Sequence, residues 1–222
     1  MTSSWNRTEY PREGDGVGFD RVVFFSDAVF AIALTLAAVE IGLPEVEGDP
    51  TSVAGLWDAV LAKNPLLGAF LVAFVWVAIY WRANHRFVMT LRAMDSAYVL
   101  ATLFFLALIA LLPIPAGVLG EYWDNPLAII LFAVYASAVS GMELVLFLVA
   151  KRNRLFIAQP GPAFARVQIL GSLSPIVIFL TSIPLAFWSS AVALLWWPVG
   201  SFLAGFALSR IAVEAPEDPA PG

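Results

Sequence analysis

The chain has 222 residues, of which 60% are hydrophobic and 13% are charged, and its formal net charge is −5. A soluble domain carries about 25% charged residues, so this composition excludes an ordinary soluble protein and indicates a chain that crosses a membrane several times. The absence of cysteine excludes disulfides and thiolate metal sites, and the absence of a basic tract excludes nucleic acid as a partner.

Six apolar stretches reach the length of about 20 residues that a membrane-spanning helix needs. In chain order, the predicted helices cover residues 19–43, 65–88, 95–116, 126–150, 166–187 and 189–210. The last two are joined so tightly that a helical hairpin is predicted. Because no internal repeat or second domain is visible, the predicted fold class is an all-α membrane protein with six transmembrane helices in a single repeat.

Lysine and arginine predict the orientation of these helices. Eleven of the twelve lie on the side of the two termini, and only Lys63 lies on the other side. Cytoplasmic loops collect these residues, so both termini are predicted to be cytoplasmic, in a multi-pass protein of the plasma membrane. The domain boundaries predicted are a flexible segment 1–18, a transmembrane domain 19–210 and a disordered acidic tail 211–222.

The first predicted helix carries a carboxylate near its start, in the stretch RVVFFSDAVFAIALTL. A charged side chain within a membrane helix costs about 3 kcal/mol, so Asp27 needs a partner or water. The second predicted helix ends in WRANHRF, where Trp81 and His85 share a face and Asn84 adjoins His85. An indole or imidazole N–H donated to Asp27, with charge compensation from Arg21 or Arg82, would satisfy the carboxylate. These residues predict a latch between the first two helices, although a packing contact without a functional role is the simpler interpretation.

The rest of the first helix has a different character. On a wheel of about 100° per residue, Leu36 and Val39 fall within about 40° of Ile32, with Thr35 at the edge of the stripe. Asp27 lies about 140° away from Ile32, on nearly the opposite face. The helix therefore has an aliphatic face and a polar face. An aliphatic stripe suits a helix–helix interface as well as a pore, and the residues alone leave both open.

The start of this helix resembles the signature of a known family. The stretch RVVFFSD fits the pattern Arg-x-x-x-Phe-Ser-Asp, with Arg21, Phe25, Ser26 and Asp27 at the matching positions. The second-helix pattern Trp-x-x-Asn-His and the six-helix layout are similar too. The pattern is that of the transmembrane protein 175 family of potassium channels, which are lysosomal in animals and lie in the plasma membrane of bacteria.

The resemblance implies a homotetramer around a central pore lined by the first helix, since this chain has one repeat. The pore and gate would comprise Ile32, Thr35, Leu36 and Val39. It implies a potassium-permeable cation channel in which an aliphatic ring serves as gate and selectivity element. No Thr-Val-Gly-Tyr-Gly stretch is present, so a carbonyl filter is not expected. Glu40 and Glu45 would concentrate cations at the outer mouth, and whether Glu40 faces the pore is open.

Other functions are weighed against the channel. One histidine, no cysteine and no cluster of catalytic side chains argue against an enzyme, and no metal or cofactor is expected. The expected partners are further copies of the chain, the lipid bilayer and monovalent cations, with potassium as the permeant ion. The alternative function is a proton-coupled secondary transporter that uses the buried carboxylate of Glu143. A non-conducting scaffold also remains open.

Overall fold

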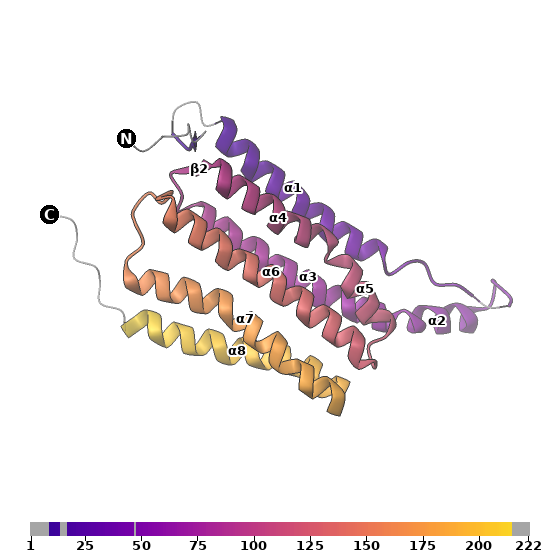
Figure 1. The fold of residues 1–222 in the computed structure, drawn as a ribbon. Helices are drawn as coiled ribbons and strands as arrows, with labels where there is room; N and C mark the ends of the chain where they lie inside the picture. Colours follow the sequence, from indigo (N-terminus) through magenta and orange to yellow (C-terminus); the bar gives the residue numbers. More distant parts are fainter. Residues whose placement is uncertain (1–8, 14–16, 47, 215–222) are drawn as a thin grey trace, which may run out of the picture.

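The computed structural model describes residues 9–13, 17–46 and 48–214, with side chains up to residue 210 (Figure 1). Its helices are α1 (Val17–Val39), α2 (Val53–Ala62), α3 (Asn64–Val88), α4 (Ser96–Leu111), α5 (Pro113–Glu121), α6 (Pro126–Arg152), α7 (Pro162–Trp188) and α8 (Ser190–Glu214). The strands are β1 (Glu9–Pro11) and β2 (Ala93–Asp95). Within the described residues, six helical stretches are long and apolar enough to cross a membrane. The expected helical membrane fold with six candidate spans is confirmed.

The first helix is shorter at its C-terminal end than the sequence suggested. Helix α1 ends at Val39 instead of Leu43, and Gly42 follows it in the left-handed region with a φ of 65°. The Gly42 N–H donates to the carbonyl of Val39, which closes the last turn of the helix. Glycine adopts this conformation without the steric penalty of a Cβ, so the helix ends before the end of the apolar stretch.

Two further boundaries differ from expectation. Helix α2 was not predicted; Ser52 caps it by accepting a hydrogen bond from the Gly55 N–H at 3.1 Å. The third predicted helix is divided into α4 and α5 at Leu112, where Pro113 begins the second part. Proline has no N–H and cannot continue the hydrogen-bond ladder, which accounts for the division.

The helices form a slab with α1 at one edge and α8 at the other, and α3, α4 and α6 between them (Figure 1). Helix α1 packs on α3, α4 and α5, whereas α7 packs on α6 and α8. Only Ser189 separates α7 from α8, so the predicted hairpin is present. The core between α6, α7 and α8 is aromatic: the Trp197 ring stacks on Phe132 at 5.1 Å and meets Phe179 edge-on at 5.3 Å.

Part of the N-terminal segment, residues 9–13, belongs to the described structure. Residues 9–11 form β1, which pairs antiparallel with β2, placing Tyr10 opposite Met94. Backbone hydrogen bonds to the α3–α4 link hold this part in place, a tertiary contact that local composition does not reveal. Residues 1–8 and 14–16 lie outside the described residues. Helix α8 ends at Glu214, within the range 211–222 given for the tail, and residues 215–222 lie outside the described part.

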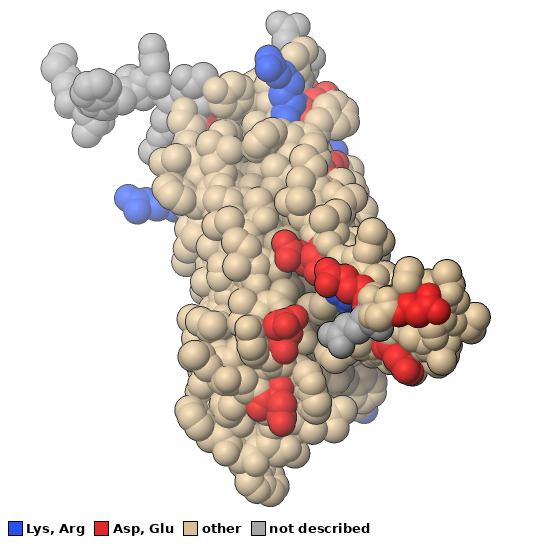
Figure 2. All heavy atoms as spheres, turned by 90° about the vertical axis from the view of Figure 1, so that its right-hand side faces the viewer, with Lys and Arg blue, Asp and Glu red and all other residues tan. Residues whose placement is uncertain are grey.

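The two ends of the slab differ in charge. The ends of the described chain lie together at the end where β2 is found, and α2 and α5 lie at the other end (Figure 1). Figure 2 looks toward the α2 end, where Asp and Glu side chains gather. Residues of this acidic end are Glu40, Glu45, Asp49, Asp58, Glu121 and Asp124. Asp49 accepts two hydrogen bonds from Thr51, which lower the pKa of this carboxyl.

Candidate functional site

The carboxylate of Asp27 lies between α1 and α3. The indole Nε1–H of Trp81 donates to Asp27 Oδ1 at 2.8 Å, which is the contact that the sequence proposed for this pair. The indole also stacks on the ring of His85, with centroids 5.4 Å apart and planes 24° from parallel. A hydrogen bond to an ionised group is about twice as strong as one between neutral groups, so this latch orients both helices.

Three of the second-helix residues therefore play different structural parts. Trp81 bonds the carboxylate directly, His85 supports the indole by stacking, and Asn84 is buried on the face that looks toward α1. Asn84 and His85 line the same pocket as Asp27. The spacing of the three residues on one helical face is what made the cluster visible in the sequence.

The four signature positions divide between two sides of α1. Ser26 is buried and donates to the Val22 carbonyl at 2.8 Å, one turn earlier in the same helix. Ser26 and Asp27 line the pocket between α1, α3 and α4, while Arg21 and Phe25 are exposed. The hydroxyl–carbonyl bond satisfies Ser26 within its own helix and leaves the carboxylate as the group that contacts α3.

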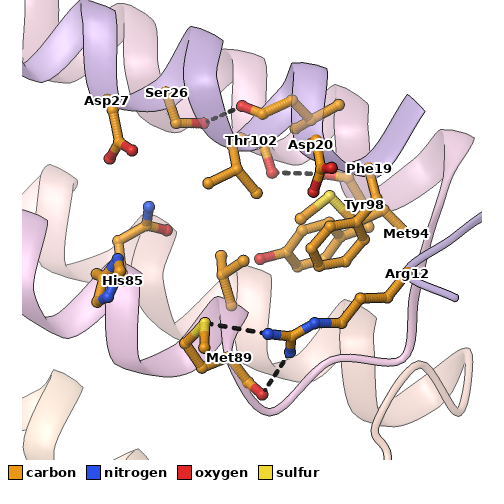
Figure 3. Close-up of a pocket in the computed structure, with 14 residues that line it drawn as sticks. Arg12, Phe19, Asp20, Ser26, Asp27, His85, Met89, Met94, Tyr98 and Thr102 are labelled. Carbon is orange, nitrogen blue, oxygen red and sulfur yellow. Dashed lines mark hydrogen bonds between the residues drawn. The ribbon is translucent and has the colours of Figure 1, made fainter. Parts of the chain in front are cut away.

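One basic side chain at the pocket was not predicted from the sequence. The arginine at the pocket is Arg12, from the segment after β1, and not Arg21 or Arg82. Its guanidinium donates to the Met89 carbonyl at 2.9 Å and lies 5.7 Å from the centre of the Phe19 ring. Figure 3 shows Arg12 reaching toward Met89 at the edge of the pocket. No local signal identifies Arg12, because β1 brings it there through tertiary pairing.

A second missed residue is Asp95, which is 2% exposed at the start of α4. Its Oδ1 accepts from the Tyr98 N–H at 2.8 Å and caps the helix. Its Oδ2 accepts from Asn153 Nδ2 at 2.7 Å, which ties α4 to the end of α6. An aspartate followed by an apolar run is an N-cap signal, so the first of these roles was readable from the sequence.

The aliphatic stripe of α1 is uncovered in the single chain. Ile32 is 56% exposed, and Leu36 and Val39 are exposed as well, whereas Ala33 and Ala37 are buried against neighbouring helices. The small alanines bring α1 close to its neighbours and leave the larger aliphatic side chains on the outer face. Thr35, also exposed, donates its hydroxyl to the Ile32 carbonyl at 2.8 Å.

Glu40 and Glu45 lie beyond the C-terminal end of α1. Glu40 Oε2 is 3.6 Å from the place that a Cβ on Gly117 would occupy, so this carboxylate leans on α5. Glu45 is exposed in the loop before α2.

Comparisons with known proteins agree with this architecture. Residues 21–113 match the family model described as "Endosomal/lysosomal potassium channel TMEM175". A potassium channel of Streptomyces collinus is 34% identical over 56% of this chain and 59% of its own length. A potassium channel of Chamaesiphon minutus is 33% identical over 56% of this chain and 61% of its own length. The matched stretches thus span less than two thirds of these relatives.

Solved structures extend the likeness to the later helices. A structure described as a lysosomal potassium-selective channel TMEM175 homolog from Chamaesiphon minutus is 25% identical, with a TM-score of 0.69, over 87% of this chain and 98% of that one. A variant of the potassium channel MtTMEM175 is 14% identical, with a TM-score of 0.61, over 97% of this chain and 100% of that one, and shows the shared fold. The family that this model describes is one of potassium channels, a resemblance that agrees with the expectation that the chain is not an enzyme. The sequence and structure comparisons together confirm the resemblance to the TMEM175 family that the first-helix signature indicated.

Proposed function

We propose that this chain forms a potassium-permeable cation channel, as a homotetramer with α1 of each copy around a central pore. The observation that carries the proposal is the division of α1 into two faces. One face is held by the Asp27–Trp81 hydrogen bond and by buried alanines, and the other presents Ile32 without a covering helix from its own chain. The family match covers α1, α3 and α4, the helices that form this arrangement.

The proposed gate is a ring of four Ile32 side chains. An aliphatic constriction excludes water when it narrows, and ions then meet a dehydration barrier. Leu36 and Val39 continue the apolar wall toward the acidic end. The Thr35 hydroxyl uses its proton within α1, so it presents acceptor lone pairs to a passing cation. Selectivity would thus arise from dehydration at the ring and from these oxygens.

The surroundings of the pore complete the proposal. Residues 19–210 form the channel domain, with both termini in the cytoplasm of a cell whose plasma membrane holds the protein. The acidic outer end, including Glu45, raises the local concentration of cations at the entrance. Because the Glu40 carboxylate packs against α5, we propose that it contributes to the negative electrostatic potential at the pore entrance.

The function is tested with purified protein in liposomes that hold a potassium gradient and no proton gradient. We expect potassium flux that exceeds sodium flux, and a mass in native mass spectrometry equal to four chains. Glu143→Gln serves as the diagnostic variant, because Glu143 lies on α6, which packs on α4, α5, α7 and α8. Flux should be unchanged in this variant.

Two results would contradict the channel. Flux that requires a proton gradient and disappears in Glu143→Gln would identify a proton-coupled transporter. An assembly that folds and forms tetramers, yet passes no ion under any gradient, would identify a scaffold.

A further inference from the structure

A polar pocket lies between α1, α3 and α4, on the opposite face of α1 from Ile32. It encloses about 110 Å³ and is lined by both polar and apolar side chains. The polar groups that matter below are Asp27, Asn84 and Tyr98, one from each of the three helices. Figure 3 shows the Tyr98 side chain and the Asp27 carboxylate on either side of this space.

The hydroxyl of Tyr98 is buried in this pocket without a hydrogen-bond partner from the described protein. Its side chain is 1% exposed, and within the described residues its phenolic oxygen has no hydrogen-bond partner. The neighbouring Thr102 hydroxyl donates to the Tyr98 carbonyl at 2.9 Å. A buried hydroxyl without a partner is costly, so natural proteins pair such groups with protein or with water.

The facing groups have unused hydrogen-bonding capacity. Asp27 uses one oxygen for the Trp81 indole, and a carboxylate accepts through both of its oxygens. The Asn84 amide, 9% exposed, offers both donors and an acceptor. A site that holds water needs two to four polar partners and roughly 10–15 Å³ of accessible space for each molecule. The pocket meets both conditions.

We propose that this pocket is a binding site for ordered water, which bridges the Tyr98 hydroxyl on α4 to Asp27 on α1 and Asn84 on α3. The bound water gives the phenol its missing partner and supplies hydration to the carboxylate. It thereby extends the direct α1–α3 latch to α4. The site does not depend on ion conduction, because it is formed within one chain and lies off the proposed pore.

The first test is a structure of the full-length protein at a resolution that shows water. We expect ordered density within hydrogen-bonding distance of Tyr98 Oη, continuing toward Asp27 and Asn84. Density for a direct bond from Tyr98 to Thr102 in a dry pocket would overturn the proposal. So would anomalous signal from rubidium in the pocket after exchange of potassium for rubidium, since the site would then bind a cation.

The second test uses the sign of a stability change. Tyr98→Phe removes the hydroxyl but keeps the ring, and we expect its Tm to fall by about 2–4 °C because a water-mediated bond is lost. Tyr135→Phe is the matched control, since its hydroxyl donates directly to the Leu108 carbonyl at 2.7 Å and should show a fall of similar size. A Tm that rises in Tyr98→Phe while it falls in Tyr135→Phe would show an unpartnered hydroxyl and contradict the site. Both readouts are independent of flux, so failure of the water site and failure of the channel are distinguishable.

Discussion

The bundle of α1, α3 and α4 and the bundle of α6, α7 and α8 are held together by different forces. The first depends on polar groups: the Asp27–Trp81 bond, the Asp95 cap and the polar pocket beside them. The second depends on aromatic packing around Trp197. Within a bilayer, lipid chains are as apolar as the core, so packing supports a helix bundle but distinguishes few arrangements. Polar contacts have a defined geometry. The Asp27–Trp81 bond lies in the bundle that presents the proposed pore helix, and a hydrogen bond from the Trp196 indole to the Thr181 hydroxyl joins α8 to α7.

The largest effect is expected where the aromatic bundle loses its central ring. Trp197→Ala removes a side chain that is 2% exposed and leaves a cavity beside Phe132 and Phe179, which should lower the free energy of unfolding by about 3 kcal/mol. Trp188→Ala, at a position that is 79% exposed, is the control and should change little. Reversible unfolding in mixed micelles measures both variants. Equal effects would mean that packing around Trp197 does not stabilise this bundle.

The next effect concerns the polar bundle. Trp81→Phe keeps an aromatic ring over His85 but removes the donor to Asp27, and we expect a loss of about 2 kcal/mol in unfolding free energy. Trp57→Phe on the exposed helix α2 is the matched change without a hydrogen bond to lose. If the two variants were equally stable, the Asp27–Trp81 contact would not be what orders α1 against α3.

A smaller effect is expected at the contact between the two bundles. Asp95→Ala removes both a helix cap and the bond to Asn153, for a loss of about 1.5 kcal/mol. Asn153→Ala removes the second interaction alone and should cost less. A double-mutant cycle on these positions measures the coupling, and additive losses would show that α4 and α6 are not joined through this pair.

The smallest effect is expected in α2, which belongs to neither bundle. Ser52→Ala removes the N-cap bond to the Gly55 N–H and should cost about 0.5 kcal/mol, because none of the α2 residues is buried. Hydrogen exchange of the α2 amides should rise while exchange in α3 stays unchanged. Faster exchange that spreads into α3 would show that α2 supports the membrane core.

The contrast between these regions also explains what the sequence could predict. Long apolar stretches predicted the six spans. The spacing of Trp81, Asn84 and His85 on one helical face predicted where the hydrogen-bond partner of Asp27 would be found. The break at Pro113 and the helix end at Gly42 follow from the backbone properties of proline and glycine. Hydropathy does not predict either boundary, because both residues lie within apolar stretches. Arg12 could not be predicted, because the pairing of β1 with β2 carries it across the fold. Tyr98 carried no signal in the sequence, because only the packing of α1, α3 and α4 places its hydroxyl in the pocket.

The central claim is that the Ile32 face of α1 lines the pore, and a matched pair of substitutions tests it. Ile32→Asn and Val75→Asn introduce the same side chain at similarly exposed positions, 56% and 53%. Ile32 follows Asp27 by five residues, and Val75 precedes Trp81 by six, so both lie on the same side of the Asp27–Trp81 contact. The account predicts that Ile32→Asn raises potassium flux into liposomes severalfold and lowers the preference for potassium over sodium, while Val75→Asn leaves both unchanged. If Ile32→Asn forms normal tetramers with unaltered flux, or if Val75→Asn produces the same increase, α1 does not line the pore.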